Sequence, residues 1–230
     1  MATRLRNNSK LFLIRHGQSI YNLENRFTGW KDVDLTKNGV DEAKNASKLL
    51  NIYTFDYAYT SVLKRAVNTL NIIFKENNTD LNIIRDAALN ERDYGDLVGQ
   101  NKKEASIKFG ADMVQQWRRS YNIPPPNGES LEMTYKRTIP FFISQIKPKL
   151  VDSNNIIISA HGNSIRSIVM YLFNYSKEEI LKTEIGWCEP WIFTFNKNNL
   201  IDFTVLTRPN CKSNSFYPSN PIKKRSSDEN

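Results

Sequence analysis

Short apolar runs alternate with stretches of helical spacing along the chain. Residues 11–14 and 156–158 are entirely apolar, which predicts strands that are buried on both faces of a parallel sheet. Residues 36–50 place apolar side chains three and four positions apart, which predicts an amphipathic helix with Thr36 as its cap. The order of strand followed by helix recurs along the sequence and predicts a single α/β domain with a parallel sheet.

The remaining elements follow from the same reasoning. Strands are predicted at residues 55–59, 191–195 and 200–206, helices at 63–74, 130–150 and 163–173, and a loop at 88–99. Pro140 should kink the helix in which it lies. Three consecutive prolines, Pro124 to Pro126, break the chain after two short helical patches.

The composition is that of an ordinary globular protein. Hydrophobic residues make up 40% of the 230 positions and charged residues 24%, which excludes collagen-like, low-complexity and mostly disordered chains. No apolar run approaches the roughly 18 residues of a membrane span, and the polar start lacks the apolar stretch of a signal peptide. We therefore expect a cytoplasmic protein with no membrane contact. Two cysteines are too few for a disulfide framework or a zinc site.

The formal charge of +8 raises the question of a nucleic-acid partner. Most of the excess lies near the termini, because residues 11–207 carry 24 Lys and Arg against 22 Asp and Glu. A nearly neutral body disfavours nucleic-acid binding. We expect a basic N-terminal extension over residues 1–10 and one domain that carries the chemistry over 11–207. A mobile C-terminal tail should follow over 208–230, where apolar side chains are few.

Both histidines of the chain stand directly after a predicted central strand and directly before a glycine. His16 follows Arg15, and His161 follows the strand at 156–158. In a parallel sheet ligands bind beyond the carboxyl ends of the strands, where a following helix points its first amides at an anion. For one histidine alone a structural or surface role would be the better explanation. Nothing in core packing requires the repetition.

Two imidazoles beside arginines suit phosphoryl transfer, in which a neutral ring nitrogen attacks phosphorus while cations hold the oxygens. A metal site is a weaker interpretation, because no third histidine and no cysteine pair completes a ligand set. The residues alone therefore predict a pair of histidines that handles phosphate, and they leave the substrate open.

Six blocks of sequence stand in order between residues 11 and 195. They are RHGQSIYN from Arg15, NRFTGW from Asn25, YTSVLKRA from Tyr59, LNERDYG from Leu89, QWRR from Gln116 and AHGNS from Ala160. Together they resemble the histidine phosphatase superfamily, and within it the bisphosphoglycerate-dependent phosphoglycerate mutases. The resemblance implies a single-domain three-layer α/β sandwich, with a mostly parallel central sheet flanked by helices. It also implies interconversion of 3-phosphoglycerate and 2-phosphoglycerate in glycolysis and gluconeogenesis through a phosphohistidine.

The resemblance further implies roles for individual residues. His16 would take the phosphoryl group, which Arg15, Arg65 and His161 would surround. Glu91 would move the proton of the substrate hydroxyl, a task at neutral pH for which a carboxyl with a pKa raised by burial is suited. On spacing alone Glu91 and the Arg118-Arg119 pair would be interpreted as solvated charges. The residues implied to bind the substrate are Asn22, Thr28, Gly29, Arg92, Tyr94, Lys102, Arg118, Arg119, Gly162 and Asn163.

The implied cofactor is 2,3-bisphosphoglycerate, which would prime His16, and no metal is expected. The partner would be a small anionic phosphorylated substrate. A homo-oligomer is allowed, but the bridge between Arg119 and Glu129 is shorter than in many mutases, which leaves lid shape and subunit contacts open.

Two further departures bear on the reaction. Gly186-Trp-Cys-Glu-Pro190 stands where the family usually has a pattern near Pro-Thr-Gly-x-Pro, and the tail after Leu206 has no clear match. If Glu189 faced the cleft it would repel an anionic intermediate, so we expect a phosphoenzyme that leaks to water. A bisphosphoglycerate or broader histidine phosphatase is therefore the second hypothesis. A catalytically silent protein that binds a phosphate ligand is the third.

Overall fold

A computed structural model of the chain describes residues 7–151, 153–207 and 212–222. Predictions for the remaining residues at either end lie outside the described residues. Six strands in the described part form one sheet, in the order β3-β2-β4-β1-β5-β6. The strands are β1 (Ser9–Arg15), β2 (Tyr57–Thr60), β3 (Ile83–Arg85), β4 (Asn155–Ala160), β5 (Trp191–Asn196) and β6 (Asn199–Val205).

Pairing in this sheet is mostly parallel. Strands β1 and β2 each pair in parallel with β4, and β3 pairs in parallel with β2. Strand β5 runs antiparallel to β1, and β6 antiparallel to β5. The predicted α/β fold with a mostly parallel central sheet is confirmed.

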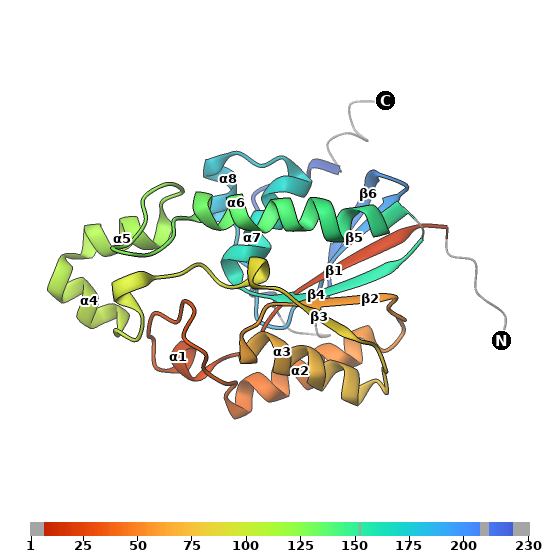
Figure 1. Cartoon of the computed structure of the whole chain (residues 1–230), viewed down its shortest axis with the longest axis horizontal. Coiled ribbons are helices and arrows are strands. Elements are labelled where there is room, and N and C mark those ends of the chain that lie inside the picture. The colour runs from red at the N-terminus through yellow and green to blue at the C-terminus, as the bar shows by residue number, and fades with distance from the viewer. Residues whose placement is uncertain (1–6, 152, 208–211, 223–230) are drawn as a thin grey trace.

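Helices lie on both sides of the sheet (Figure 1). Helices α2 (Lys37–Leu50) and α3 (Lys64–Glu76) cover one face. Helices α6 (Leu131–Phe141) and α7 (Gly162–Phe173) cover the other. The molecule therefore has the three layers that the resemblance implies.

Alternate side chains of β1 enter two separate cores, as the period of two along a strand requires. Phe12 packs in a cluster with Ala43 of α2 and Leu70 of α3. Its neighbour Leu13 packs in the cluster on the opposite face, which includes Ile165 of α7. All five side chains are fully buried. Burial on both faces explains why β1 is an unbroken apolar run rather than an alternating one.

A small extension stands at one end of the molecule, where α4 (Lys102–Phe109) and α5 (Ala111–Arg119) form a hairpin (Figure 1). It has a cluster of its own, in which Phe27 packs with Val114 and Trp117. The other two helices of the described chain are α1 (Ile20–Leu23) and α8 (Lys177–Lys182). The extension places the C-terminal end of α5, with its two arginines, near the carboxyl ends of the strands.

Three elements differ from their prediction. The helix predicted over residues 130–150 is regular only as far as Phe141; a π-helical turn (Phe142–Ile146) and a 3-10 turn (Lys147–Val151) follow. Pro140 has no N–H to donate, so the change of hydrogen-bond pattern begins just beyond it. Strand β3 was not predicted, because three residues show no periodicity. The loop predicted over residues 88–99 contains two short 3-10 turns.

The part of the predicted tail that the structure describes, residues 212–222, is docked on the domain. Phe216 pairs with Glu184 through two backbone hydrogen bonds, and the ring of Tyr217 packs edge-on against Trp191. The hydroxyl of Tyr175 donates a hydrogen bond to the carbonyl of Ser219. The expectation of an unattached tail therefore does not hold for these residues.

The hydroxyl of Ser215 is a point of this attachment that a substitution can test. Its oxygen accepts hydrogen bonds from the Gly186 N–H and from the indole N–H of the fully buried Trp191, both at 2.9 Å. Ser215→Ala would leave both donors without that acceptor, so we expect the free energy of unfolding to fall by about 1–3 kcal/mol. Urea denaturation followed by tryptophan fluorescence measures this.

Ser213→Ala is the matched control, because the hydroxyl of exposed Ser213 contacts Glu189 at the surface. That variant should change the free energy of unfolding by no more than about 0.5 kcal/mol. Equal effects of the two substitutions would contradict the assignment of Ser215 as the anchor.

Candidate active site

Parallel pairing of β1 with β4 brings the two histidines together. Arg15 and Ala160 are partners in the register of the two strands, so His16 and His161 follow at the same level of the sheet. Their ring centroids are 5.0 Å apart, and both side chains are buried. The structure thus assembles the pair whose sequence contexts are alike.

Backbone contacts fix the ring of His16. Its Nδ1 lies 2.7 Å from the carbonyl oxygen of Gly17, and a carbonyl only accepts, so Nδ1 carries the hydrogen. The lone pair is then on Nε2, toward which the Nε–H of Arg65 points at 3.3 Å. Burial, followed by the charges of Arg65 and Arg15, lowers the pKa of His16 well below its ordinary value. The ring is therefore neutral, and Nε2 carries its lone pair.

His161 is held from the opposite side. Its Nε2 lies 2.7 Å from the hydroxyl of Ser61, and the residue stands at the start of α7, next to Gly162. Burial first, and then the charge of Arg65, lower the pKa of His161 well below its ordinary value. Ser61 is a contact that the sequence did not single out, although it lies within the block from Tyr59.

Two arginines border the histidine pair. Arg65 donates hydrogen bonds to the carbonyls of Lys31 and Gly29, which hold the loop after α1 against the site. Burial lowers the pKa of Arg65 to about 10. Arg15 donates to the carbonyl of Ile185 and lies 5.4 Å from the centroid of the Trp187 ring. Its Nε–H is buried without a hydrogen-bond partner within the described structure, and an anionic oxygen could fill that place.

The carboxylate of Glu91 lies at the same site. One of its oxygens accepts hydrogen bonds from the Arg92 N–H at 2.8 Å and from the N–H and amide group of Asn163 at 3.1 and 2.9 Å. Burial raises the pKa of Glu91, but these bonds and the charges of Arg65 and Arg15 outweigh it, and the pKa is lowered. The expectation of a raised pKa is therefore wrong for the ligand-free protein, because the residues that surround this carboxyl stabilise its charge.

Further cations line the mouth of the site. A small pocket lies between Arg92, Arg118, Arg119, Asn163 and Arg166. Burial is the main cause that lowers the pKa of Arg118, Lys102 and Arg166. Arg92 donates to the hydroxyl of Tyr94 at 3.0 Å, and its own Nε–H is buried without a partner in the described chain.

Glu184 is an acid of this region that the sequence did not point to. Its two carboxylate oxygens accept hydrogen bonds from Arg119 at 2.5 Å and from Arg166 at 2.7 Å. Arg119, predicted to bind substrate, is therefore paired with a carboxylate in the ligand-free protein. No sequence signal revealed the pair, since the two partners lie 65 positions apart.

The residues predicted to supply neutral donors occupy the loop after β1. The side-chain oxygen of Asn22 accepts hydrogen bonds from the backbone and hydroxyl of Ser19, which orients its amide at the start of α1. Thr28 is buried, and Gly29 has φ +52°, a conformation that favours glycine. The carbonyl of Gly29 is the one that Arg65 holds.

The departure before Pro190 has a structural explanation. Cys188 stands where the family pattern has glycine, and its φ of 53° lies in the left-handed region that favours glycine. Glu189 faces the tail, where its carboxylate accepts hydrogen bonds from the hydroxyl of Ser213 and the N–H groups of Asn214 and Ser215. Glu189 therefore does not face the cleft, and the expectation that it repels an anionic intermediate there is wrong.

The described residues lack a metal-binding cluster and a membrane-spanning helix. They contain no group of three or more His, Cys, Asp or Glu side chains placed to hold a metal ion. No helix among them is long and apolar enough to cross a membrane.

Comparison with known proteins shows the family of this chain. Residues 11–203 match the histidine phosphatase superfamily (branch 1), and the chain belongs to that family. It is 50% identical over 201 residues to the 2,3-bisphosphoglycerate-dependent phosphoglycerate mutase of Nitrobacter hamburgensis, covering 86% of this chain and 95% of that protein. The mutase of the same name from Cytophaga hutchinsonii is 48% identical over 186 residues, or 81% of this chain and 87% of its own.

Solved structures share the fold. Bacillus stearothermophilus YhfR aligns with a TM-score of 0.75 at 22% identity, over 86% of this chain and 95% of that one. The alpha-ribazole phosphatase from Shigella flexneri aligns with a TM-score of 0.73 at 22% identity, over 86% and 94%.

The buried neutral histidines predict how stability depends on pH. The unfolded chain takes up a proton at each histidine near pH 6.5, whereas the folded chain does so only at a much lower pH. Protons therefore favour the unfolded state, and the free energy of unfolding of the unphosphorylated protein should fall as pH drops from 7.5 to 5.5. The slope should approach about 1.4 kcal/mol per histidine per pH unit below pH 6.5.

Urea denaturation at pH 7.5, 6.5 and 5.5 measures this slope. The chain has two histidines, so the variant with His16→Gln and His161→Gln reports all other groups. A double variant with the same slope as the parent protein would show that neither histidine is the cause.

Proposed function

We propose that this protein interconverts 3-phosphoglycerate and 2-phosphoglycerate, the glycolytic and gluconeogenic step, with 2,3-bisphosphoglycerate as the donor that primes His16. The observation that carries the proposal is the joint placement of His16 and Glu91. The imidazole of His16 is neutral, and its lone pair points toward the buried Arg65. The carboxylate of Glu91, which is ionised, lies in the same site. The family and the names of the relatives supply the substrate.

The buried donors fit a phosphorylated ligand. The Nε–H groups of Arg15 and Arg92 have no partner among the described residues, and each would gain one from a phosphate or carboxylate oxygen. Arg15, Arg65 and His161 would surround the phosphoryl group on His16, with Asn22 and the loop at Thr28 and Gly29 as neutral donors. Charge that develops on the oxygens would then meet groups already in place.

Glu91 would exchange the proton of the substrate hydroxyl. In the phosphoenzyme that hydroxyl attacks phosphorus while the ionised Glu91 takes its proton, the new O–P bond forms and the N–P bond to His16 Nε2 breaks. In the second half the N–P bond forms again and Glu91 returns the proton to the leaving oxygen. The phosphoryl oxygens would also offset the charges of Arg15 and Arg65, which would raise the pKa of Glu91 toward neutrality.

The outer cations would hold the other end of the substrate. Arg92, Arg118, Arg119 and Lys102, with Tyr94, form a rim of charge suited to a carboxylate or a second phosphate. Gly162 and Asn163 begin α7, where Asn163 also orients Glu91. Arg119 would have to share its charge between the ligand and Glu184.

The direct test follows two products at once. The purified protein is incubated with 3-phosphoglycerate, with and without 2,3-bisphosphoglycerate, and 2-phosphoglycerate and inorganic phosphate are both measured. We expect 2-phosphoglycerate in excess, formed faster with the bisphosphate, and acid-labile label from radioactive bisphosphate that His16→Ala abolishes. Excess inorganic phosphate would favour a phosphatase, and neither product would favour a silent binding protein.

A second expectation concerns Glu91. Glu91→Gln keeps the shape of the side chain but cannot accept the hydroxyl proton, so the turnover number should fall by about 10²- to 10⁴-fold. Some label should still reach His16 from radioactive bisphosphate. Steady-state rates and the label are measured on the same preparation, and near-normal turnover would return Glu91 to a structural role.

A further inference from the structure

A partly buried ion pair contacts the backbone of Glu91. Neither of its members lies in the six sequence blocks, and the proposed reaction gives neither a role. The pair joins Glu129, at the turn before α6, to Arg137 within α6, and 21% of the Arg137 side chain and 15% of the Glu129 side chain are exposed. We propose that Arg137, held by Glu129, is a positioning residue that fixes the backbone of Glu91. The inference rests on the proton-transfer role proposed for Glu91.

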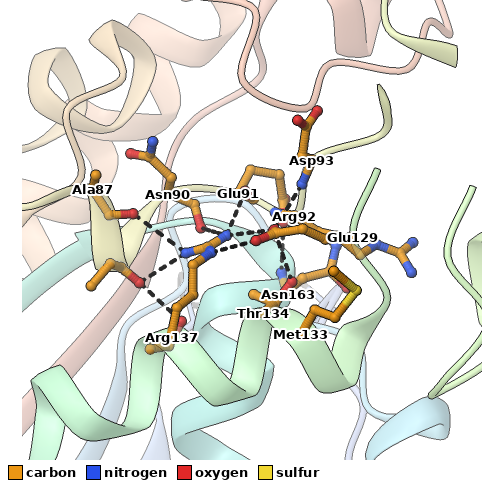
Figure 2. A network of polar contacts seen from close by, with 12 residues as sticks. Ala87, Asn90, Glu91, Arg92, Asp93, Glu129, Met133, Thr134, Arg137 and Asn163 are labelled. Carbon is orange, nitrogen blue, oxygen red and sulfur yellow. Dashed lines mark hydrogen bonds and ion pairs between the residues drawn. The ribbon is translucent and has the colours of Figure 1, made fainter. Parts of the chain in front are cut away.

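The guanidinium of Arg137 donates hydrogen bonds to backbone carbonyls of the segment that ends at Glu91 (Figure 2). One terminal nitrogen donates to the carbonyls of Ala87 and Ala88 at 3.4 and 2.9 Å. The other donates to the carbonyls of Asn90 and Glu91 at 3.1 and 2.8 Å. Four carbonyls within five consecutive residues thus converge on one planar cation, a geometry that the single ammonium group of lysine cannot reproduce.

Glu129 holds both the arginine and the far side of the same loop. Its carboxylate accepts from Arg137 at 2.8 and 2.9 Å and from the N–H of Asp93 at 3.0 Å. The backbone N–H of Glu129 donates to the carbonyl of Asp93 at 2.9 Å. The two members of the ion pair therefore bind opposite polar groups of one backbone segment, carbonyls before Arg92 and an amide after it.

Trp30 contacts both the Glu91 carbonyl and the guanidinium of Arg137. Its indole N–H donates to the carbonyl of Glu91 at 2.6 Å, and its ring centroid lies 5.7 Å from the guanidinium carbon of Arg137. The Glu91 carbonyl thus accepts two hydrogen bonds, one from Arg137 and one from Trp30. The Glu91 carboxylate meanwhile binds the N–H and amide of Asn163.

Hydrogen bonds therefore hold both the backbone carbonyl and the side-chain carboxylate of Glu91, and different residues donate them. Asn163 belongs to the site and sets the direction of the carboxylate, while Arg137 sets where the side chain starts. A shift of about 1 Å in a group that must meet a reacting atom can cost about 100-fold in rate. Loss of Arg137 should accordingly lower turnover through Glu91, while the substrate cations on α4 and α5, Lys102, Arg118 and Arg119, stay in place.

The test compares four variants in two backgrounds. Arg137→Met removes the donors and the charge, Arg137→Lys keeps the charge, and Trp30→Phe keeps the ring but loses the N–H bond to Glu91. Lys136→Met is the matched control, because exposed Lys136 pairs with Glu132 on the same helix and touches none of these groups. Each is measured alone and together with Glu91→Gln, as turnover number and KM for 3-phosphoglycerate.

We expect Arg137→Met to lower the turnover number by about 10- to 100-fold, with KM changed less than about twofold. Arg137→Lys should lie between this variant and the parent, Trp30→Phe should lose severalfold, and Lys136→Met should match the parent. In the Glu91→Gln background Arg137→Met should lower the residual turnover by less than about twofold, because a residue that acts through Glu91 has nothing left to position.

The contrary outcomes are distinct. An equal fall from Arg137→Met in both backgrounds would overturn the inference alone, since it would mark a structural role unconnected with proton transfer. Normal turnover of Glu91→Gln by itself would overturn the proposed role of Glu91 and this inference with it. Should Arg137→Met fail to fold, as judged by near-ultraviolet circular dichroism, Arg137→Lys and Trp30→Phe carry the same comparison.

Discussion

Parallel pairing of β1 with β4 places Arg15 opposite Ala160, and both strands end at that level of the sheet. His16 and His161 come next on each strand, so their 5.0 Å separation follows from sheet geometry rather than from any contact between the rings. Glycine follows each histidine, and the backbone beyond it turns toward α1 on one side and into α7 on the other. The other groups of the site are arranged around this fixed pair.

Burial then decides the chemical state of each group. The two imidazoles lose their protons because burial and the neighbouring arginines both disfavour a positive charge. Glu91 keeps its negative charge in the same surroundings, because hydrogen bonds and arginines outweigh the cost of burial. The same two cations thus favour a neutral His16 and an ionised Glu91. The Nε–H groups of Arg15 and Arg92 are buried without a hydrogen-bond partner among the described residues, so each could donate to a bound anion.

The features that the sequence predicted correctly are those that depend on residues within one short segment. The apolar runs of β1 and β4, the cap at Thr36 and the repeated His-Gly context each lie within one segment, so the sequence indicated the fold and the histidine pair. The pKa of Glu91 depends on arginines from β1 and α3, and the partner of Arg119 lies 65 positions away, so neither could be inferred from spacing. The docked tail was missed for another reason: its attachment includes backbone pairing of Phe216 with Glu184 and hydrogen bonds to Ser215, and hydropathy does not register such polar contacts.

The contact between the loop after His16 and the start of α2 limits how this protein can evolve. A Cβ atom on Gly17 would stand 2.4 Å from the carbonyl oxygen of Gly39, and one on Gly39 would stand 2.2 Å from the carbonyl oxygen of Gln18. Both obstacles are backbone, which cannot rotate away as a side chain can. Even a single methyl group at either position would force α2 and the His16 loop apart. Gly39 has no side chain to take part in chemistry, yet its lack of a Cβ atom is what allows α2 to pack against the loop that follows His16.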